Sequence, residues 1–220
     1  YPNVLVGEVW ICSGQSNMGW AVNGSDDSDL EILTAEFPNL RLISVPQVGT
    51  QEPQNDFNGQ WEATTPEVAK NFSAVGYFFG RRLHQALRVP VGLIDNAWGG
   101  SACEAWIPRD RLNATAVAKP YMDQWRETES NYDAEAAREK YEKQKAKWAD
   151  QVKKAKEAGK PRPRAPRPPR NPLTGQHRPA NLYNGVLKPI IGYGIKGAIW
   201  YQGESNSARG HAYREVFPLM

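Results

Sequence analysis

Residues 9–18, VWICSGQSNM, place a short apolar run directly before a turn of small and amide residues. Residues 91–101 (VGLIDNAWGGS) and residues 195–206 (IKGAIWYQGESN) repeat this organisation. Short apolar runs bounded by turn residues are typical of buried strands in a parallel sheet. In an open α/β sheet, functional groups gather beyond the C-terminal ends of the strands. The three segments therefore predict an α/β fold with one site built from three loops.

A helix is predicted over residues 73–88. Ser73 is a suitable N-cap, and Pro90 ends the helix. Its apolar residues recur at three- and four-residue spacing: Val75, Phe78, Phe79, Leu83, Ala86 and Leu87. A strand at residues 91–95 follows at once, which is the βαβ rhythm of a parallel sheet. Further strands are expected at residues 4–12, 41–45 and 195–201, and shorter helices at residues 29–36, 182–191 and 208–219.

Composition limits the function. With 220 residues, 40% of them hydrophobic, the chain suits one domain. No apolar run approaches the roughly 20 residues of a membrane helix, so we expect no membrane insertion. Cys12 and Cys103 are predicted to be buried free thiols. The net charge of +3 reflects one basic, proline-rich stretch, which argues against nucleic-acid binding: Lys160, Arg162, Arg164, Arg167, Arg170 and Arg178.

Residues 121–178 read as an insertion. Ala, Glu and Lys dominate from Asp133 onward, with acidic residues first and lysines last, as the helix dipole favours. We therefore expect one long helix over residues 121–158, lying on the domain. Gly159 and Pro161 end it. The Pro/Arg-rich linker over residues 160–172 is expected to be an extended, solvated spacer.

Ser16 has the position that a nucleophilic serine needs, on a tight turn after a strand. Gly14 lets the backbone turn and lets a substrate approach. Gln15 and Asn17 are neutral groups that can orient a polar substrate. Ser13 lies nearer the strand and is expected to be structural. The segment is not the Gly-x-Ser-x-Gly elbow, because Met18 follows Asn17.

The other two segments offer polar partners. Gly99-Gly100 can present an unhindered N–H to an oxyanion, although an ordinary glycine turn explains the pair equally well. Gln202, Glu204 and Asn206 supply a polar wall, in which Glu204 is expected to brace a loop. Asn184 is a possible pocket donor or a helix cap.

Five blocks of the chain, in order, resemble the sialate O-acetylesterases and related carbohydrate acetylesterases of the SGNH hydrolase superfamily. The similarity spans nearly the whole chain outside residues 121–178. The blocks are residues 7–18 (GEVWICSGQSNM), 73–79 (SAVGYFF), 98–106 (WGGSACEAW), 182–185 (LYNG) and 200–206 (WYQGESN).

The resemblance implies a three-layer α/β/α sandwich and a serine esterase. By this resemblance Ser16 is the nucleophile and its own N–H an oxyanion donor. Gly100, or alternatively Gly99, supplies a second N–H. The last block departs from the usual Gly-x-Asn pattern, so we expect a third donor from Gln202, or else Asn206. The implied substrate is an acetylated sugar or glycan, hydrolysed through an acetyl-enzyme without metal or cofactor. Such enzymes are usually secreted or periplasmic.

The family's Asp-x-x-His base has no counterpart in these 220 residues. Two explanations are open: one SGNH-like domain, incomplete at its C-terminus, or a carbohydrate-binding relic without activity. The abrupt start and stop favour the first. His84, His177 and His211 are poor candidates for the base, and we expect feeble hydrolysis or none from residues 1–220 alone. The particular sugar, the acetylated hydroxyl and the oligomeric state are not determined by the sequence.

Overall fold

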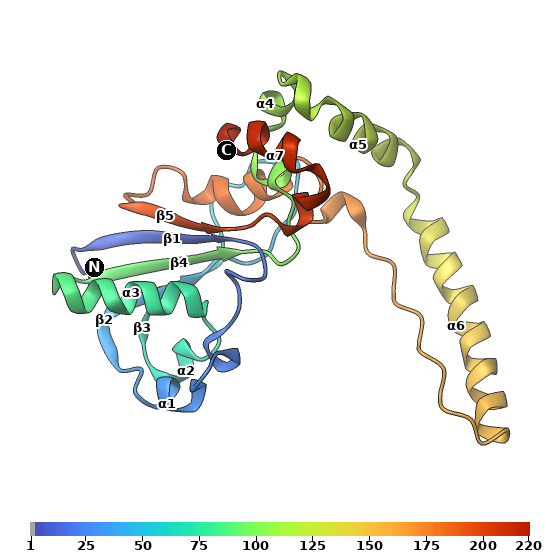
Figure 1. Ribbon diagram of the computed structural model, residues 1–220, viewed down its shortest axis with the longest axis horizontal. Helices are drawn as coiled ribbons and strands as arrows, with labels where there is room; N and C mark the ends of the chain where they lie inside the picture. The colour runs from blue at the N-terminus through green and yellow to red at the C-terminus, as the bar shows by residue number, and fades with distance from the viewer. Residues whose placement is uncertain (1–2) are drawn as a thin grey trace.

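The computed structural model describes residues 3–220 and contains one five-stranded sheet in the order β3-β2-β4-β1-β5 (Figure 1). β1, β2, β4 and β5 are parallel, and the edge strand β3 is antiparallel. The predicted α/β class is confirmed. The strands are β1 (Glu8–Gly14), β2 (Phe37–Ser44), β3 (Glu62–Thr64), β4 (Val91–Ala97) and β5 (Gly197–Tyr201).

Apolar side chains alternate between the two faces of the sheet, so both faces are covered. On one face, Cys12, Leu42 and Leu93 join the cluster packed against α3 (Ala74–Leu87). On the other, Ile11, Ile43 and Ile94 belong to the cluster that contains Trp106, Leu182 and Val186. The second layer is not regular α-helix: it is built from η2 (Cys103–Trp106), a π-helical turn η5 (Tyr183–Leu187) and η6 (Lys188–Ile190).

The predicted helix after Ser73 is confirmed. The Ser73 hydroxyl accepts a hydrogen bond from Gly76 N at 3.0 Å and donates one to Met18 O at 2.5 Å, so the cap also ties α3 to the first loop. The remaining helices are α1 (Ser28–Leu33), α2 (Pro66–Ala69), α4 (Arg109–Asn113), α5 (Lys119–Asn131), α6 (Ala134–Glu157) and α7 (Gly210–Val216), with short 3-10 turns at η1 (Val22–Gly24), η3 (Ala116–Ala118), η4 (Pro172–Thr174), η7 (Glu204–Arg209) and η8 (Phe217–Leu219). Within residues 3–220 no helix is long and apolar enough to span a membrane.

Two strand predictions are corrected. Residues 4–7 lie outside β1 and are exposed, so the strand starts at Glu8. The sequence predicts a buried strand at residues 195–201, but β5 pairs only with β1 among the described strands, and Tyr201 is 51% exposed. An apolar run predicts a strand without showing whether that strand lies at the edge of the sheet.

The single long helix predicted over residues 121–158 is wrong. The chain breaks at Tyr132 and Asp133, where the Asp133 carboxylate accepts from the N–H groups of Glu135 and Ala136 and so starts a new helix. α6 contains no buried residue and projects away from the sheet instead of lying on it (Figure 1).

Residues 160–171, the strap, return beside α6 toward the sheet (Figure 1). They contain no helix or strand, in agreement with the predicted extended linker. Trp148 Nε1 donates to Pro163 O at 3.0 Å, and the Arg162 guanidinium lies 4.9 Å from the centre of the Trp148 ring. The side of α6 that carries Trp148 is therefore covered by the strap. We call α6 and the strap, residues 134–171, the arm.

Both limbs of the arm are anchored to the domain by one carboxylate. Glu129, near the end of α5, accepts hydrogen bonds from Arg109 of α4 and from Arg178 Nε, the latter at 2.8 Å. Arg178 also donates to Leu173 O at 2.9 Å, just beyond the strap. These ion pairs fix where the arm leaves the domain and where it returns.

Leu93→Ala tests the central packing of the sheet. Leu93 is fully buried and lies against Gly80 of α3, so the truncation should leave a cavity and cost about 3 kcal/mol in the free energy of unfolding. Denaturant unfolding measures this cost. Leu30→Ala, at a side chain 61% exposed, is the control and should change stability by less than about 0.5 kcal/mol. Equal costs at the two positions would contradict the packing described.

Candidate active site

Ser16 is presented by a sharp turn at the end of β1. Gly14 has φ of 138°, and a Cβ there would lie 2.2 Å from Tyr201 O. Gln15 N donates to this Tyr201 oxygen at 2.9 Å, and the N–H groups of Met18 and Gly19 both donate to Gln15 O at 3.0 Å. The turn leaves Ser16 exposed.

Ser13, the other serine of this segment, is structural as predicted. It is buried, and its hydroxyl donates to Asn96 O at 2.7 Å. Ser16 is therefore the hydroxyl of this segment that a substrate can reach.

The loop after β4 brings Gly99 beside Ser16, and Gly100 follows Gly99 in the chain. Trp98 N donates to Gly14 O at 3.0 Å, and a Cβ at Gly99 would lie 3.5 Å from Ser16 Cβ. Gly100 has φ of 72°, a backbone conformation that favours glycine. Within residues 3–220, the N–H groups of Ser16, Gly99 and Gly100 have no hydrogen-bond acceptor. Three free amide donors thus accompany an exposed hydroxyl.

Side chains from two other segments orient the glycine turn by its carbonyl oxygens. Gly99 O accepts from Gln176 Nε2 at 3.3 Å. Gly100 O accepts from Ser205 Oγ and from His177 Nε2, each at 2.7 Å. Because a carbonyl only accepts, the His177 proton at this contact lies on Nε2. These orienting residues were not predicted, because nothing in the sequence pairs them with the glycines.

The first and third loops are joined by amide side chains. Gln15 Oε1 accepts from Gly203 N at 2.9 Å and from Glu204 N at 3.1 Å, and Asn17 Nδ2 donates to Glu204 Oε1 at 3.0 Å. Glu204 braces a loop, as predicted. Gln15 is only 1% exposed, so its predicted contact with substrate is corrected to a bracing role. Asn17 is half-buried at the rim of the turn.

Gln202 and Asn206 need a correction as well. Gln202 Nε2 donates to Ser101 O at 2.8 Å and to Asn206 Oδ1 at 2.9 Å, which uses both amide hydrogens. Gln202 therefore has no hydrogen left for an oxyanion in this arrangement. Asn206 is buried, accepts from Cys103 N at 2.9 Å, and donates to Glu104 Oε2 at 2.9 Å. Both amides therefore help to hold the loops of the site together. They belong to a set of polar side chains that we call the frame: Gln15, Glu104, Gln202, Ser205, Asn206 and Arg209.

Glu104 is the buried charge at the centre of this frame. It is 2% exposed, and Arg209 Nη2 approaches Glu104 Oε1 to 3.2 Å. A buried carboxylate is tolerated when it is paired and hydrogen-bonded, and here an arginine and an asparagine satisfy it. The Arg209 guanidinium also lies 4.4 Å from the centre of the Tyr121 ring, which connects the frame to α5.

Asn184 does not belong to the site. It is buried in η5, and its Nδ2 donates to Gln51 O at 2.9 Å. The predicted role as a pocket donor is wrong, because this amide secures the loop around residue 51. The alternative of a helix cap is also replaced, since η5 shows no side-chain cap bond.

Ser16 opens into a hollow of about 490 Å³ that is also lined by Trp20, Gln47, Asp95 and Gly99. A second hollow of about 600 Å³ shares Gln47 and Gly99 with the first and extends to Arg170 of the strap. The two hollows adjoin, so the surface around Ser16 continues to Arg170, close to where the arm joins the domain.

Asp95 is the titratable group of the first hollow. Burial raises the pKa of this carboxyl to about 7, while the backbone N–H of Ala97 opposes the change. Within the described part of the chain, Asp95 Oδ1 is buried without a hydrogen-bond partner. Burial also raises the pKa of Cys12 to about 12, and the thiols of Cys12 and Cys103 are free and buried, as predicted.

The raised pKa of Asp95 predicts a pH-dependent cost. From pH 4 to 7 the unfolded chain has lost this proton while the folded protein retains it, so stability falls as pH rises, by up to about 4 kcal/mol in total. Asp95→Asn removes the titration. Its stabilising effect, measured by denaturant unfolding, should be about 3 kcal/mol larger at pH 8 than at pH 5.

Asp150→Asn, at an exposed position of α6, is the matched control for this measurement. An effect of Asp95→Asn that is the same at both pH values would show that Asp95 is not held protonated.

No group of three or more His, Cys, Asp or Glu side chains in residues 3–220 is placed to hold a metal ion. In the same residues no hydrogen bond joins a histidine to Ser16: His177 contacts Gly100 O, and His84 Nδ1 lies 2.7 Å from Val89 O.

Residues 6–160 match the family described as carbohydrate esterase, sialic acid-specific acetylesterase. The chain belongs to this family. It is 29% identical to the human sialate O-acetylesterase, over 99% of this chain and 35% of that protein, and 30% identical to the Rattus norvegicus enzyme of the same name, over 99% and 39%. The crystal structure of a carbohydrate acetylesterase from Xanthomonas citri matches with a TM-score of 0.69 and 29% identity, over 99% of this chain and 37% of that one. The chain thus spans little more than a third of these relatives.

Proposed function

We propose that residues 1–220 carry the nucleophile and oxyanion donors of an esterase that removes O-acetyl groups from sialic acid or a related glycan. The observation that carries the proposal is the exposed Ser16 hydroxyl, which lies beside Gly99, together with the unpaired N–H groups of Ser16, Gly99 and the adjoining Gly100. Oriented donors of this kind stabilise the negative charge that develops when an ester carbonyl is attacked. Membership of the acetylesterase family supports the choice of an acetylated sugar.

The reaction proceeds in two steps. Ser16 Oγ attacks the acetyl carbonyl, its proton passes to a base, and the carbonyl oxygen receives hydrogen bonds from the free N–H groups. The ester C–O bond then breaks and the sugar leaves as an alcohol, having gained a proton. Water attacks the acetyl-enzyme and releases acetate and free Ser16. The carbonyl contacts of Gln176, His177 and Ser205 keep the glycine turn oriented in both steps.

The base is not assigned within these residues. The family resemblance implies an Asp-x-x-His pair, and this spacing does not occur in residues 1–220. Loss of the base removes activation of the serine and leaves positioning and the oxyanion donors. A protein with this site but no such pair would bind acetylated sugars without hydrolysing them, which is the second candidate function.

The nucleophile is tested by acetate release from O-acetylated sialic acid. Because residues 1–220 contain no Asp-x-x-His pair, the assay needs a longer protein in which such a pair follows these residues. Ser16→Ala should lower the rate by at least about 10³-fold, because the attacking oxygen is lost. Ser207→Ala, at an exposed serine of η7, should retain the parent rate. Equal rates for the parent and Ser16→Ala would exclude Ser16 as the nucleophile.

A second test distinguishes the loss of an oxyanion donor from the effect of strain in the backbone. Gly100 and Gly159 both have positive φ, 72° and 63°, so alanine should cost each a similar amount of about 1 kcal/mol. Only Gly100→Ala disturbs a donor beside Ser16, and it should lower kcat by about 10²-fold. Gly159→Ala, in the arm, should leave kcat unchanged. A normal kcat for Gly100→Ala would remove Gly100 from the oxyanion site.

We also propose that the protein acts outside the cytoplasm, in a secreted or periplasmic location, because related enzymes are usually exported. Fractionation of the source cells tests this, and recovery of the protein with the cytosol would contradict it.

A further inference from the structure

The charge of the chain is divided between the arm and the rest of the molecule. Residues 134–171 contain 13 of the 27 Lys and Arg residues but only 5 of the 24 Asp and Glu residues. The arm therefore carries +8 and the rest of the chain −5. The total of +3 conceals this separation. A strongly positive segment on an otherwise negative protein raises the local concentration of anions around itself.

Little of this positive charge is neutralised inside the arm. Two ion pairs occur on α6, Lys143–Glu139 at 3.8 Å and Lys145–Glu142 at 4.0 Å, and both are exposed. No ion pair in residues 3–220 involves the four arginines of the strap. These guanidinium groups are available to an external anion: Arg162, Arg164, Arg167 and Arg170.

The strap presents its arginines at regular intervals. Pro163 and Pro166 are half-buried beside α6, whereas Arg164, Arg167 and Arg170 are exposed. In a polyproline-type chain a three-residue spacing returns to the same side about every 9 Å. The three arginines thus form a row of cations suited to a linear polymer that carries carboxylates at regular intervals.

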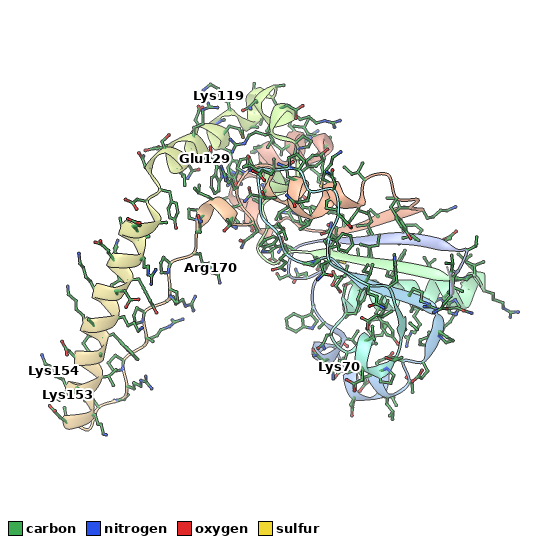
Figure 2. The ribbon with its side chains drawn as sticks, turned by 180° about the vertical axis from the view of Figure 1, so that it is seen from behind. Lys70, Lys119, Glu129, Lys153, Lys154 and Arg170 are labelled. Carbon is green, nitrogen blue, oxygen red and sulfur yellow. The ribbon has the colours of Figure 1, made fainter. Side chains whose placement is uncertain are left out.

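Arg170, the last arginine of this row, lies next to the candidate active site. Figure 2 shows Arg170 where the strap approaches the domain, and Lys153 and Lys154 at the far tip of the arm. Arg170 lines the second hollow, which shares Gln47 and Gly99 with the hollow of Ser16. A polymer held along the strap would therefore extend toward Ser16.

The side chains of the arm disfavour two other polyanionic partners. The aromatic residues Tyr141 and Trp148 are half-buried on the side of the strap, so they offer no exposed platform for stacking nucleic-acid bases. No large apolar side chain in residues 134–171 is exposed, so the arm lacks the apolar face with which interfacial helices enter a membrane.

We propose that the arm is a docking element for an acidic glycan, in which the row Arg164, Arg167 and Arg170 binds carboxylate-bearing sugars and leads the chain of sugars to Ser16. This inference rests on the proposed function, because it assigns to the same site a polymeric, acidic form of the acetylated substrate. Arg170, next to the Ser16 hollow, is the residue of the row that lies nearest to the reacting ester.

Binding of polysialic acid to the full chain in the Ser16→Ala background tests the proposal without requiring hydrolysis. Replacing the three strap arginines with Gln (R164Q, R167Q, R170Q) should weaken binding at least about tenfold at low salt, because three cations that displace counterions are lost. The control variant R82Q, R88Q, R214Q removes the same charge from exposed positions outside the arm and should bind as the parent does. Dextran, a neutral polymer, should not bind.

Unchanged binding by the strap variant, or tighter binding of single-stranded RNA or phosphatidylserine vesicles than of polysialic acid, would overturn the proposal. A kinetic comparison separates it from the proposed function. In a hydrolytically active protein, the strap variant should raise KM for O-acetylated polysialic acid at unchanged kcat, and leave hydrolysis of 4-nitrophenyl acetate as it is. Loss of both activities through Ser16→Ala, with strap-dependent binding retained, would support both assignments.

Discussion

The candidate site depends on the close packing of three parallel strand ends around Gly14. Trp98 N donates to Gly14 O, and Gln15 N donates to Tyr201 O, so the backbones of β4 and β5 hold the end of β1 from both sides. A Cβ at Gly14 would lie 2.2 Å from Tyr201 O, and the residue has positive φ. Only glycine fits this approach. The turn that exposes Ser16 beside Gly99 therefore follows from main-chain geometry.

A frame of polar side chains then fixes the three loops relative to one another. Gln15 reaches the third loop, Ser205 reaches Gly100 of the second, and the group formed by Glu104, Asn206 and Arg209 lies beneath them. Buried polar groups make a structure rigid when their hydrogen bonds are satisfied. The amide and hydroxyl donors of the frame are used in hydrogen bonds between the loops. Within the described residues, the backbone N–H groups of Ser16, Gly99 and Gly100 remain free. Donors of this kind need little reorganisation when charge develops on a substrate.

The sequence was sufficient to place the four parallel strands and the loops that meet at the site, because short apolar runs followed by glycine and amides have few alternative structures. The antiparallel edge strand β3, only Glu62–Thr64, was missed because three residues are too few to show an apolar run. It was insufficient for the roles of Gln15, Gln202 and Asn184. An amide side chain both donates and accepts, and only the fold shows whether its partner is a neighbouring loop or a substrate.

The structure of the arm could also be predicted only in part from the sequence. The sequence predicts a helix that lies on the domain, and it could not show that the strap, and not the sheet, covers the side of α6 that carries Trp148. The break at Asp133 was also missed, since the acidic residues that begin a helix resemble those inside a charged one. Part of the insertion nevertheless returns to the site: Gln176 and His177, just beyond the strap, orient the glycine turn.

The proposed chemistry requires that Ser16 Oγ and the glycine N–H groups face one reacting atom. The most direct measurement is a crystal structure of the protein after reaction with an organophosphonate, whose tetrahedral phosphorus imitates the attacked ester. We expect phosphorus bonded to Ser16 Oγ, with the phosphoryl oxygen within about 3 Å of the N–H groups of Ser16 and Gly100. Phosphorus on another serine, or a phosphoryl oxygen turned away from these N–H groups, would contradict it.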